Sequence, residues 1–338
     1  MKVAVDAMGG DNSPQLVVQG ALRALSEPGV EVILVGSEDS VGREIGAGSL
    51  PPGVDFHRCE DVVGMNESPL KAVRRRKSSS IRVAFELVKQ GKADALVSAG
   101  NSGATLAAGV LTLGRMKGVE RPGIAGIFPG RHGPVVVMDV GANVDCRPGH
   151  LLQFGALAHS FCRSFLGIAS PRIGLLNIGE ESGKGNELVR RAGELFRGGP
   201  LNFLGNVEGG DILSGKVDAV VCDGFVGNVV LKLAEGVSET IGRSILKDLR
   251  RSLSGRPAME LAGNVLRLLE GKYNYQAYGG APLLGINGVA LVCHGGSSAR
   301  AIENAVKRAS RYAEAGVTEQ MAGILASLKF DRAQDPDN

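Results

Sequence analysis

Short apolar runs that end in loops rich in Gly, Asn, Asp and Ser are the feature that most constrains this chain. Each run has the length of a single β-strand. In an open α/β sheet the carboxyl ends of the strands line the ligand crevice, and glycine lets backbone N–H groups approach a ligand closely. The pattern therefore predicts one shared, oxygen-rich ligand site that suits a phosphate group. The loops span residues 6–11, 98–104, 139–143, 177–186 and 223–228.

Apolar runs alternate with amphipathic segments along most of the chain. This alternation predicts βα units and therefore an α/β fold with a doubly wound, mainly parallel sheet. Strands are expected at 2–6, 31–35, 54–57, 94–98, 123–128, 134–139, 172–178, 201–204, 217–222 and 288–293. Helices are expected at 14–26, 79–91, 103–116, 149–166, 184–197, 227–252, 257–271, 297–315 and 318–328. The first helix is expected to begin with Ser13 as its N-cap and Pro14 at its first position.

The composition argues against several classes of protein. Of the 338 residues none is Trp, and aromatic residues make up only 4%. Because base-stacking modules depend on aromatic side chains, we expect no nucleic-acid partner. Five cysteines without a C-x-x-C pair fit a reducing cytoplasm better than a disulfide framework or a metal site. No apolar run approaches the ~20 residues that span a bilayer.

Residues 227–271 break the alternation and are predicted to form a helical hairpin with a turn near 254–257. This hairpin could pack on its own core, form a dimer interface, or touch an anionic membrane surface near its tip. The residues expected to make the membrane or dimer contact are Leu249, Leu253, Met259 and Leu261. Because no low-complexity linker divides the chain, residues 1–330 are predicted to form one domain. The polar tail at 331–338 is expected to be flexible.

Several standard catalytic signatures are absent from the sequence. No G-x-G-x-x-G follows a strand, and residues 179–185 lack the spacing of a P-loop. No H-E-x-x-H, EF-hand or G-x-S-x-G pattern occurs either. These absences argue against a dinucleotide site, a metalloprotease and a serine hydrolase.

The loop at 98–104 is the best candidate for an anion cradle. Gly100 and Gly103 allow close backbone approach, and Asn101 and Ser102 add neutral donors where a helix is expected to begin. The alternative is an ordinary turn between a strand and a helix. Lys184 lies in another glycine loop, where it is either a phosphate ligand or an ordinary surface lysine.

Two acids and a basic run allow two interpretations each. Asp139 and Asp223 end apolar runs, and each precedes an asparagine, Asn143 or Asn228. The acids either orient loop amides, or steer a proton or bind a divalent ion. The basic run at 74–77 either docks an acidic protein by charge steering or is the solvated start of a helix.

Seven segments together resemble the bacterial phosphate acyltransferases, the PlsX family. They are residues 5–11, 97–104, 139–146, 175–181, 205–209, 223–228 and 279–285. The resemblance implies a fold similar to that of isocitrate and isopropylmalate dehydrogenases and of phosphotransacetylases, with two lobes and a central cleft. It also implies that inorganic phosphate attacks the thioester of a long-chain acyl carrier protein, with no metal or other cofactor.

The resemblance also implies a cytoplasmic homodimer that associates peripherally with the membrane. A membrane glycerol-3-phosphate acyltransferase would use the acyl phosphate it makes. The expected catalytic residues are Lys184, which would hold phosphate, Asn228, which would donate to phosphate or the thioester oxygen, and Asp223. The expected substrate-binding residues are Asp6, Gly9, Gly10, Asp11, Ser98, Gly100, Asn101, Ser102, Gly103, Asp139, Asn143, Glu180 and Asn206.

The sequence leaves three alternatives. One is a phosphotransacetylase that uses a coenzyme A thioester, and another is an NAD- and metal-dependent dehydrogenase of the same fold. The third is a membrane-bound scaffold, which would not explain so many polar glycine loops.

Overall fold

The computed structural model describes residues 1–46, 49–252 and 279–328. The second helix predicted for the hairpin, with Met259 and Leu261, lies outside the described residues, as do Leu253 and the tail at 331–338. Leu249 lies on a described helix, but its side chain is outside the description. The membrane or dimer contact assigned to these four residues therefore stays a prediction.

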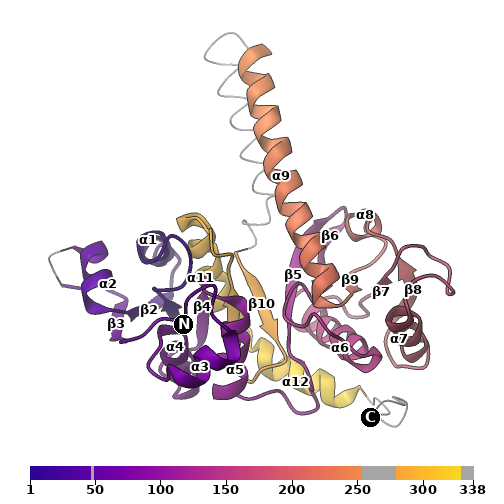
Figure 1. Ribbon diagram of the computed structural model, residues 1–338, viewed down its shortest axis with the longest axis horizontal. Coiled ribbons are helices and arrows are strands. Elements are labelled where there is room, and N and C mark those ends of the chain that lie inside the picture. Colours follow the sequence, from indigo (N-terminus) through magenta and orange to yellow (C-terminus); the bar gives the residue numbers. More distant parts are fainter. Residues whose placement is uncertain (47–48, 253–278, 329–338) are drawn as a thin grey trace.

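Eleven strands form one sheet within the described residues, in the order β3-β2-β1-β4-β11-β10-β5-β6-β9-β7-β8. The run of βα units predicted from the sequence is present, with helices on both faces of this sheet (Figure 1). The strands are β1 (Lys2–Asp6), β2 (Glu31–Gly36), β3 (Val54–Arg58), β4 (Ala95–Ser98), β5 (Gly123–Gly130), β6 (Gly133–Met138), β7 (Ile173–Leu176), β8 (Phe203–Val207), β9 (Ala219–Val221), β10 (Ala281–Leu284) and β11 (Val289–Val292).

The sheet is parallel in each half and reverses direction in the middle. Strands β3, β2, β1, β4 and β11 are parallel to one another, and so are β6, β9, β7 and β8. Between these halves, β10 is antiparallel to β11 and β5, and β5 is antiparallel to β6. The carboxyl ends of the strands in the two halves therefore lie at opposite edges of the sheet.

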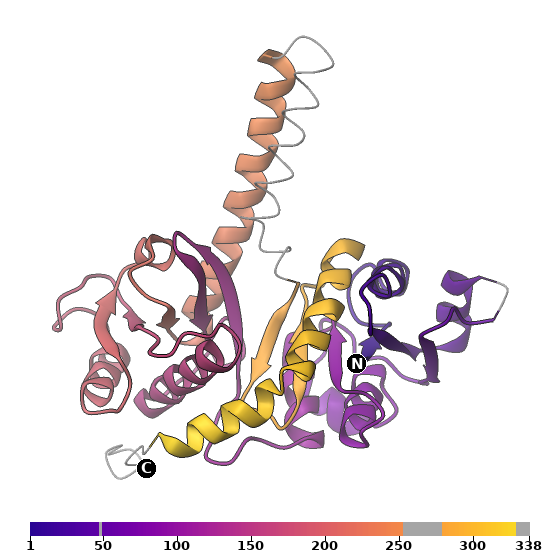
Figure 2. The same cartoon turned by 180° about the vertical axis from the view of Figure 1, so that it is seen from behind.

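The described helices are α1 (Gln15–Ala24), α2 (Glu38–Ile45), α3 (Pro69–Arg75), α4 (Ser80–Lys89), α5 (Ser102–Thr112), α6 (Pro148–Ser164), α7 (Glu187–Arg197), α8 (Asp211–Ser214), α9 (Gly224–Ser252), α11 (Ala299–Glu314) and α12 (Val317–Ser327). Figure 1 shows α9 extending far beyond the rest of the molecule. Figure 2 shows α11 and α12 crossing from one half to the other, where α11 packs on α1 and α12 packs on α6. No helix in the described ranges combines the length and the apolar character that crossing a bilayer requires.

The core explains the continuous apolar runs in the sequence. In β6, Val135 and Val137 join one buried cluster, whereas Val136 and Met138 join the cluster on the opposite face. Because successive side chains of a strand point to opposite faces, a strand covered on both faces must be apolar at every position. The sheet is therefore the middle layer between two layers of helices.

The predicted N-cap of the first helix is wrong. Pro14 occupies the cap position of α1, and no side chain caps this end. The Ser13 hydroxyl instead donates to the carbonyl oxygens of Met8 (3.0 Å) and Gly10 (2.9 Å). The hydroxyl thus closes the loop after β1 and is not available to the helix.

Candidate active site

The first group of predicted site residues lies at the adjacent carboxyl ends of β1 and β4. Asp6 and Ser98 are partners in the parallel register, and both are buried. The Ser98 hydroxyl donates to Asp6 Oδ2 at 2.7 Å, and the Gly100 amide donates to the Ser98 oxygen at 3.1 Å. Burial raises the pKa of Asp6, and this effect outweighs the hydrogen bonds to its carboxylate, which lower the pKa. This buried network fixes both loops relative to each other.

Gly9 shows why the loops must approach so closely. A Cβ atom at this position would lie 2.7 Å from Asp6 Oδ2 and 2.7 Å from the Gly100 nitrogen. No other residue fits there without moving the backbone. Gly9 therefore lets the loop after β1 pack directly on the loop after β4, and both loops line a small polar pocket with Asn101.

Helix α5 begins at once after this contact, with Asn101 as its N-cap. Asn101 Oδ1 accepts from the Ala104 amide (3.0 Å), and its Nδ2 donates to the Met65 carbonyl oxygen (2.8 Å). The side chain is thus used at both ends to hold the helix start. Ser102, which follows, is exposed. The N-terminus of this eleven-residue helix offers backbone amides of the kind that favour an anion.

The second group lies at the carboxyl ends of β6 and β9. Asp139 is fully buried and accepts five hydrogen bonds. Its Oδ1 accepts from the amides of Ile124 (3.1 Å), Gly141 (3.2 Å) and Ala142 (3.0 Å). Its Oδ2 accepts from the amide (2.6 Å) and Nδ2 (2.9 Å) of Asn143. Burial raises the pKa of Asp139 against these bonds. Of the two interpretations of this acid, the geometry favours the one in which it orients loop amides.

Residues 223–228, which were expected to form a loop, begin helix α9. Asp223 Oδ1 accepts from the Val226 amide at 2.9 Å, which is the bond of an N-cap. The Gly224 amide donates to the Asn143 carbonyl oxygen at 2.7 Å. A Cβ at Gly227 would lie 1.9 Å from the Asp139 carbonyl oxygen, so this glycine permits helix packing and does not indicate a loop. Asn228, in the same turn, is exposed.

Lys184 lies in the neighbouring loop after β7, and not at a helix start, because α7 begins at Glu187. The loop is held from two sides. Asn177 Nδ2 donates to the Lys184 carbonyl oxygen (3.0 Å), and Asn206 Nδ2 donates to the Glu181 carbonyl oxygen (2.9 Å). The Lys184 side chain is exposed, and within the described ranges no ion pair involves it. Its ammonium group is therefore free to meet an anion.

Glu180, another predicted substrate-binding residue, lies in the same loop as Lys184. Its carboxylate forms an ion pair with Lys216 at 2.5 Å. A carboxylate is also a poor neighbour for phosphate, because the two negative charges repel each other.

Cys146, beside Asp139, is not an activated nucleophile, because burial together with Asp139 and Asp223 raises the pKa of its thiol to about 12. In the part of the chain that the structure describes, no three His, Cys, Asp or Glu side chains gather as metal ligands.

The two groups of loops are separate within one chain. Between β4 and β6 lie β11, β10 and β5, so the separation along the sheet is four strand spacings of ~4.8 Å, or about 19 Å. The first group comprises Asp6, Gly9, Gly10, Asp11, Ser98, Gly100, Asn101, Ser102 and Gly103. The second comprises Asp139, Asn143, Glu180, Lys184, Asn206, Asp223 and Asn228. The expected single site therefore divides into two halves, and the roles of these residues stay predictions.

Sequence reasoning missed one loop of the first group, at 294–298. The Gly295 carbonyl oxygen accepts from the Asp11 amide at 2.9 Å. The methyl group of Met65 lies 2.9 Å from where a Gly295 Cβ would be. The sequence contained the signal, because Gly295 and Gly296 follow a predicted strand like the other loops.

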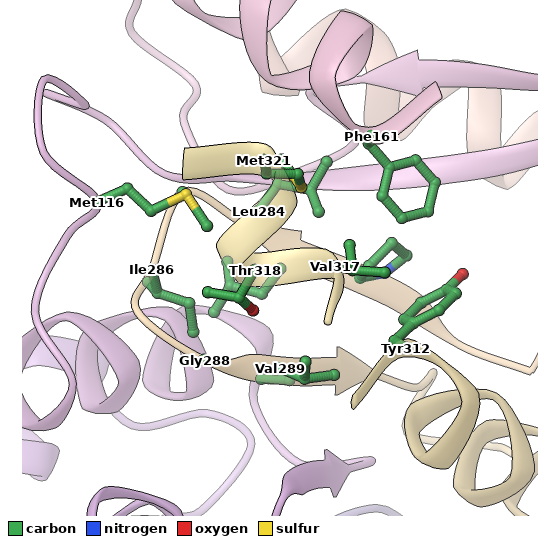
Figure 3. Close-up of a pocket in the computed structure, with 14 residues that line it drawn as sticks. Met116, Phe161, Leu284, Ile286, Gly288, Val289, Tyr312, Val317, Thr318 and Met321 are labelled. Carbon is green, nitrogen blue, oxygen red and sulfur yellow. The ribbon is translucent and has the colours of Figure 1, made fainter. Parts of the chain in front are cut away.

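A second pocket lies away from all predicted site residues (Figure 3). It is lined mainly by apolar side chains of α12, the β10–β11 hairpin and their neighbours, among them Met116, Leu284, Ile286, Val317 and Met321. The polar side-chain groups in its lining are the hydroxyls of Tyr312 and Thr318.

Comparisons with known proteins identify the family of this chain. The family described as "Fatty acid synthesis protein" matches residues 1–320. A phosphate acyltransferase of Geotalea uraniireducens is 50% identical over 327 residues, which cover 96% of this chain and 94% of that protein. A phosphate acyltransferase of Desulforudis audaxviator is 45% identical over 337 residues and is covered completely, as is this chain.

Solved structures show the same fold at low sequence identity. A phosphotransacetylase from Streptococcus pyogenes has a TM-score of 0.63 at 20% identity, over 93% of this chain and 94% of that one. A branched-chain phosphotransacylase from Enterococcus faecalis has a TM-score of 0.54 at 14% identity, over 92% and 98% of the two chains. These matches confirm the expected fold, and the relatives confirm the resemblance found in the motifs. The chain is an acyltransferase and belongs to the phosphate acyltransferase family.

Proposed function

We propose that the chain transfers the acyl group of a long-chain acyl carrier protein to inorganic phosphate. The products are an acyl phosphate and the free carrier protein. The observation that carries this proposal is Lys184, an exposed cation on a loop that Asn177 and Asn206 hold in place. Strands β7 and β9 are adjacent, so this loop lies one strand spacing from the N-terminus of α9. A fixed cation beside a helix N-terminus suits a phosphate group.

The proposed reaction needs no covalent intermediate and no cofactor. A phosphate oxygen attacks the carbonyl carbon of the thioester, and the electrons of the C=O bond move onto oxygen. When they return, the C–S bond breaks and the thiolate leaves and takes up a proton. Lys184 offsets the charge of phosphate, while Asn228 donates to the oxyanion, and Asp223 caps the helix that carries Asn228. The main contribution is the positioning of two reactants, with stabilisation of the oxyanion.

A homodimer would bring the two groups of loops together. Seven large apolar side chains described on α9 are exposed, a quantity of apolar surface that indicates a partner. We propose that α9 contacts a second copy, so that the α5 N-terminus of one protomer faces Lys184 of the other. The exposed side chains are Phe225, Val226, Val229, Leu233, Val237, Ile241 and Ile245.

We propose that the dimer is cytoplasmic and binds the membrane peripherally through Leu249, Leu253, Met259 and Leu261. There the acyl phosphate would pass to a membrane glycerol-3-phosphate acyltransferase. A use of the acyl phosphate in membrane lipid synthesis fits the family's place in fatty acid synthesis.

The test is phosphate-dependent release of carrier-protein thiol from palmitoyl carrier protein, with palmitoyl coenzyme A in parallel. We expect release to require phosphate and to be faster with the carrier protein. Lys184→Ala and Asn228→Ala should each lower kcat/KM about 100-fold or more, the usual cost of a lost charge or donor at the transition state. Near-normal values for both variants would refute the site. Faster release from coenzyme A would support the phosphotransacetylase alternative, and no release from either thioester would refute both.

Hybrid dimers then test whether the site is shared. Asn101→Asp keeps the cap of α5 but places a negative charge at the anion-binding end, so this variant should be inactive like Lys184→Ala. If the two groups meet across the dimer, mixed and reassembled protomers should regain roughly a quarter of the activity, because half of the dimers are hybrids with one intact site. No recovery would place the whole site within one protomer.

A further inference from the structure

We propose that the outer face of α3 docks an acidic protein surface, that of the partner which delivers the acyl thioester. The α3 face is defined here as Leu70, Lys71, Arg74 and Arg75, with Met65 before the helix and Lys77 after it. This inference rests on the proposed function, since only a protein-borne thioester needs a docking surface.

Helical geometry puts four of these residues on one side of α3. At ~100° per residue, positions 70, 74, 71 and 75 span an arc of about 140°. All four side chains are exposed, whereas Ala72 and Val73 on the opposite side are buried. Leu70 is 46% exposed and Met65 is 42% exposed. The face therefore combines cations with apolar side chains that water surrounds.

The cations of this face are free, and Arg76 is not one of them. Arg76 pairs with Asp61 at 3.1 Å and with Glu67 at 3.0 Å. It therefore anchors the C-terminal end of α3 to the segment that precedes the helix. In the described ranges, by contrast, no ion pair involves Lys71, Arg74, Arg75 or Lys77. The basic run at 74–77 thus divides into one structural residue and a free set that also includes Lys71.

The charge of this segment is local and unbalanced. Residues 67–77 contain five cations and a single acid, Glu67, whereas the whole chain has a formal net charge of only +3. Such a patch raises the association rate of an acidic protein and orients it before contact. No aromatic side chain accompanies the cations, so the face lacks the stacking platforms of a single-strand nucleic-acid surface.

The α3 face lies beside the first group of the candidate site. Asn101, the cap of α5, donates through Nδ2 to the Met65 carbonyl oxygen at 2.8 Å. At the start of α3, Pro69 Cγ lies 2.8 Å from where a Cβ of Gly103 would be. A protein bound to α3 therefore sits against the anion-binding end of α5, where its thioester can reach the site.

The test compares two charge reversals of equal size. Arg74→Glu with Arg75→Glu should raise KM for palmitoyl carrier protein about tenfold, with kcat and KM for phosphate little changed. The variant's KM should also depend less on salt than that of the wild type. Lys89→Glu with Lys92→Glu is the control, because these exposed lysines lie where α4 ends, before the amino end of β4. The control should match the wild type.

Two further probes separate this proposal from the proposed function. Palmitoyl pantetheine carries the thioester without a protein, so its KM should not change in Arg74→Glu with Arg75→Glu. Binding of unacylated carrier protein, measured by calorimetry, needs no reaction and should weaken about tenfold in the same variant. If the wild type transfers the acyl group but the variant binds and turns over carrier protein normally, the docking surface is refuted and the function stands.

A last experiment measures the binding of the wild type and the α3 variant to vesicles that contain phosphatidylglycerol. If the α3 variant loses vesicle binding and keeps carrier-protein binding, the face is a lipid surface and the proposal is overturned. If the wild type releases no thiol but binds carrier protein through α3, the proposed reaction fails and the docking surface survives.

Discussion

At the scale of single residues, the candidate site contains buried carboxylates whose oxygens already accept hydrogen bonds from the surrounding loops. Asp139 accepts five hydrogen bonds and holds the loop against which the first turn of α9 packs. The sequence showed that this acid ends a strand, but it could not show which groups the acid meets. Ile124, one of its donors, belongs to a different strand, so this hydrogen bond becomes visible only in the folded sheet.

Asp139→Asn should destabilise the fold. The new amide nitrogen would face backbone N–H donors whichever way the side chain turns, and the strong bonds to a charged acceptor would be lost. We expect the free energy of unfolding to fall by about 2–4 kcal/mol, measured by urea denaturation. Asp223→Asn is the matched control, because asparagine is as good an N-cap as aspartate. Equal effects of the two changes would contradict this account of Asp139.

At the scale of elements, the long helices and most strands followed from sequence periodicity. The short helices α2, α3 and α8, strand β10 and the first turn of α9 did not. Strand β10 was missed because Gly280, Pro282 and Gly285 in and around it resemble a loop. Pairing on both sides makes this segment a strand, and local sequence does not contain that information. The start of α9 was missed because its glycines were taken for loop residues. Gly224 and Gly227 looked like loop residues, but they are small because the helix packs closely on the Asp139 loop.

A pair of charges joins the starts of β7 and β9. Arg172 donates to Asp218 from its amide (2.8 Å), Nε (2.9 Å) and Nη2 (2.9 Å). Desolvation raises the pKa of Asp218, but the bonds and charge of Arg172 outweigh it, so that pKa lies below the usual 3.8. A lowered pKa means that the ionised acid stabilises the fold above pH ~4, and that this contribution is lost as the pH falls through the lowered value.

Asp218→Asn should therefore cost stability only above that range. At pH 7 we expect a loss of about 1–2 kcal/mol in the free energy of unfolding. The difference between variant and wild type should shrink steadily below pH 4 in denaturation curves taken across the pH range. A difference that is constant from pH 7 to pH 2 would show that the charge contributes nothing.

At the scale of the whole molecule, the exposed apolar side chains of α9 form the surface through which we propose that two copies of the chain associate. If α9 forms the proposed dimer interface, Leu233→Glu with Val237→Glu should shift the protein from dimer to monomer in sedimentation velocity, because buried charges would oppose association. Activity should fall with the dimer fraction if the site is shared. Leu204→Glu with Leu213→Glu places the same charges on exposed leucines outside α9 and should leave the dimer intact. An unchanged dimer in the α9 variant would place the interface elsewhere.

The position of β10 and β11 also determines the order in which the chain can be completed during synthesis. These strands come from residues 281–292, yet they fill the middle of the sheet. A nascent chain that ends before them holds two unconnected sheets, one ending at β4 and the other at β5, each with an open edge. Such edges invite pairing with other chains, and contacts so distant in sequence form slowly. The ribosome thus has to release nearly the whole chain before its two halves can join.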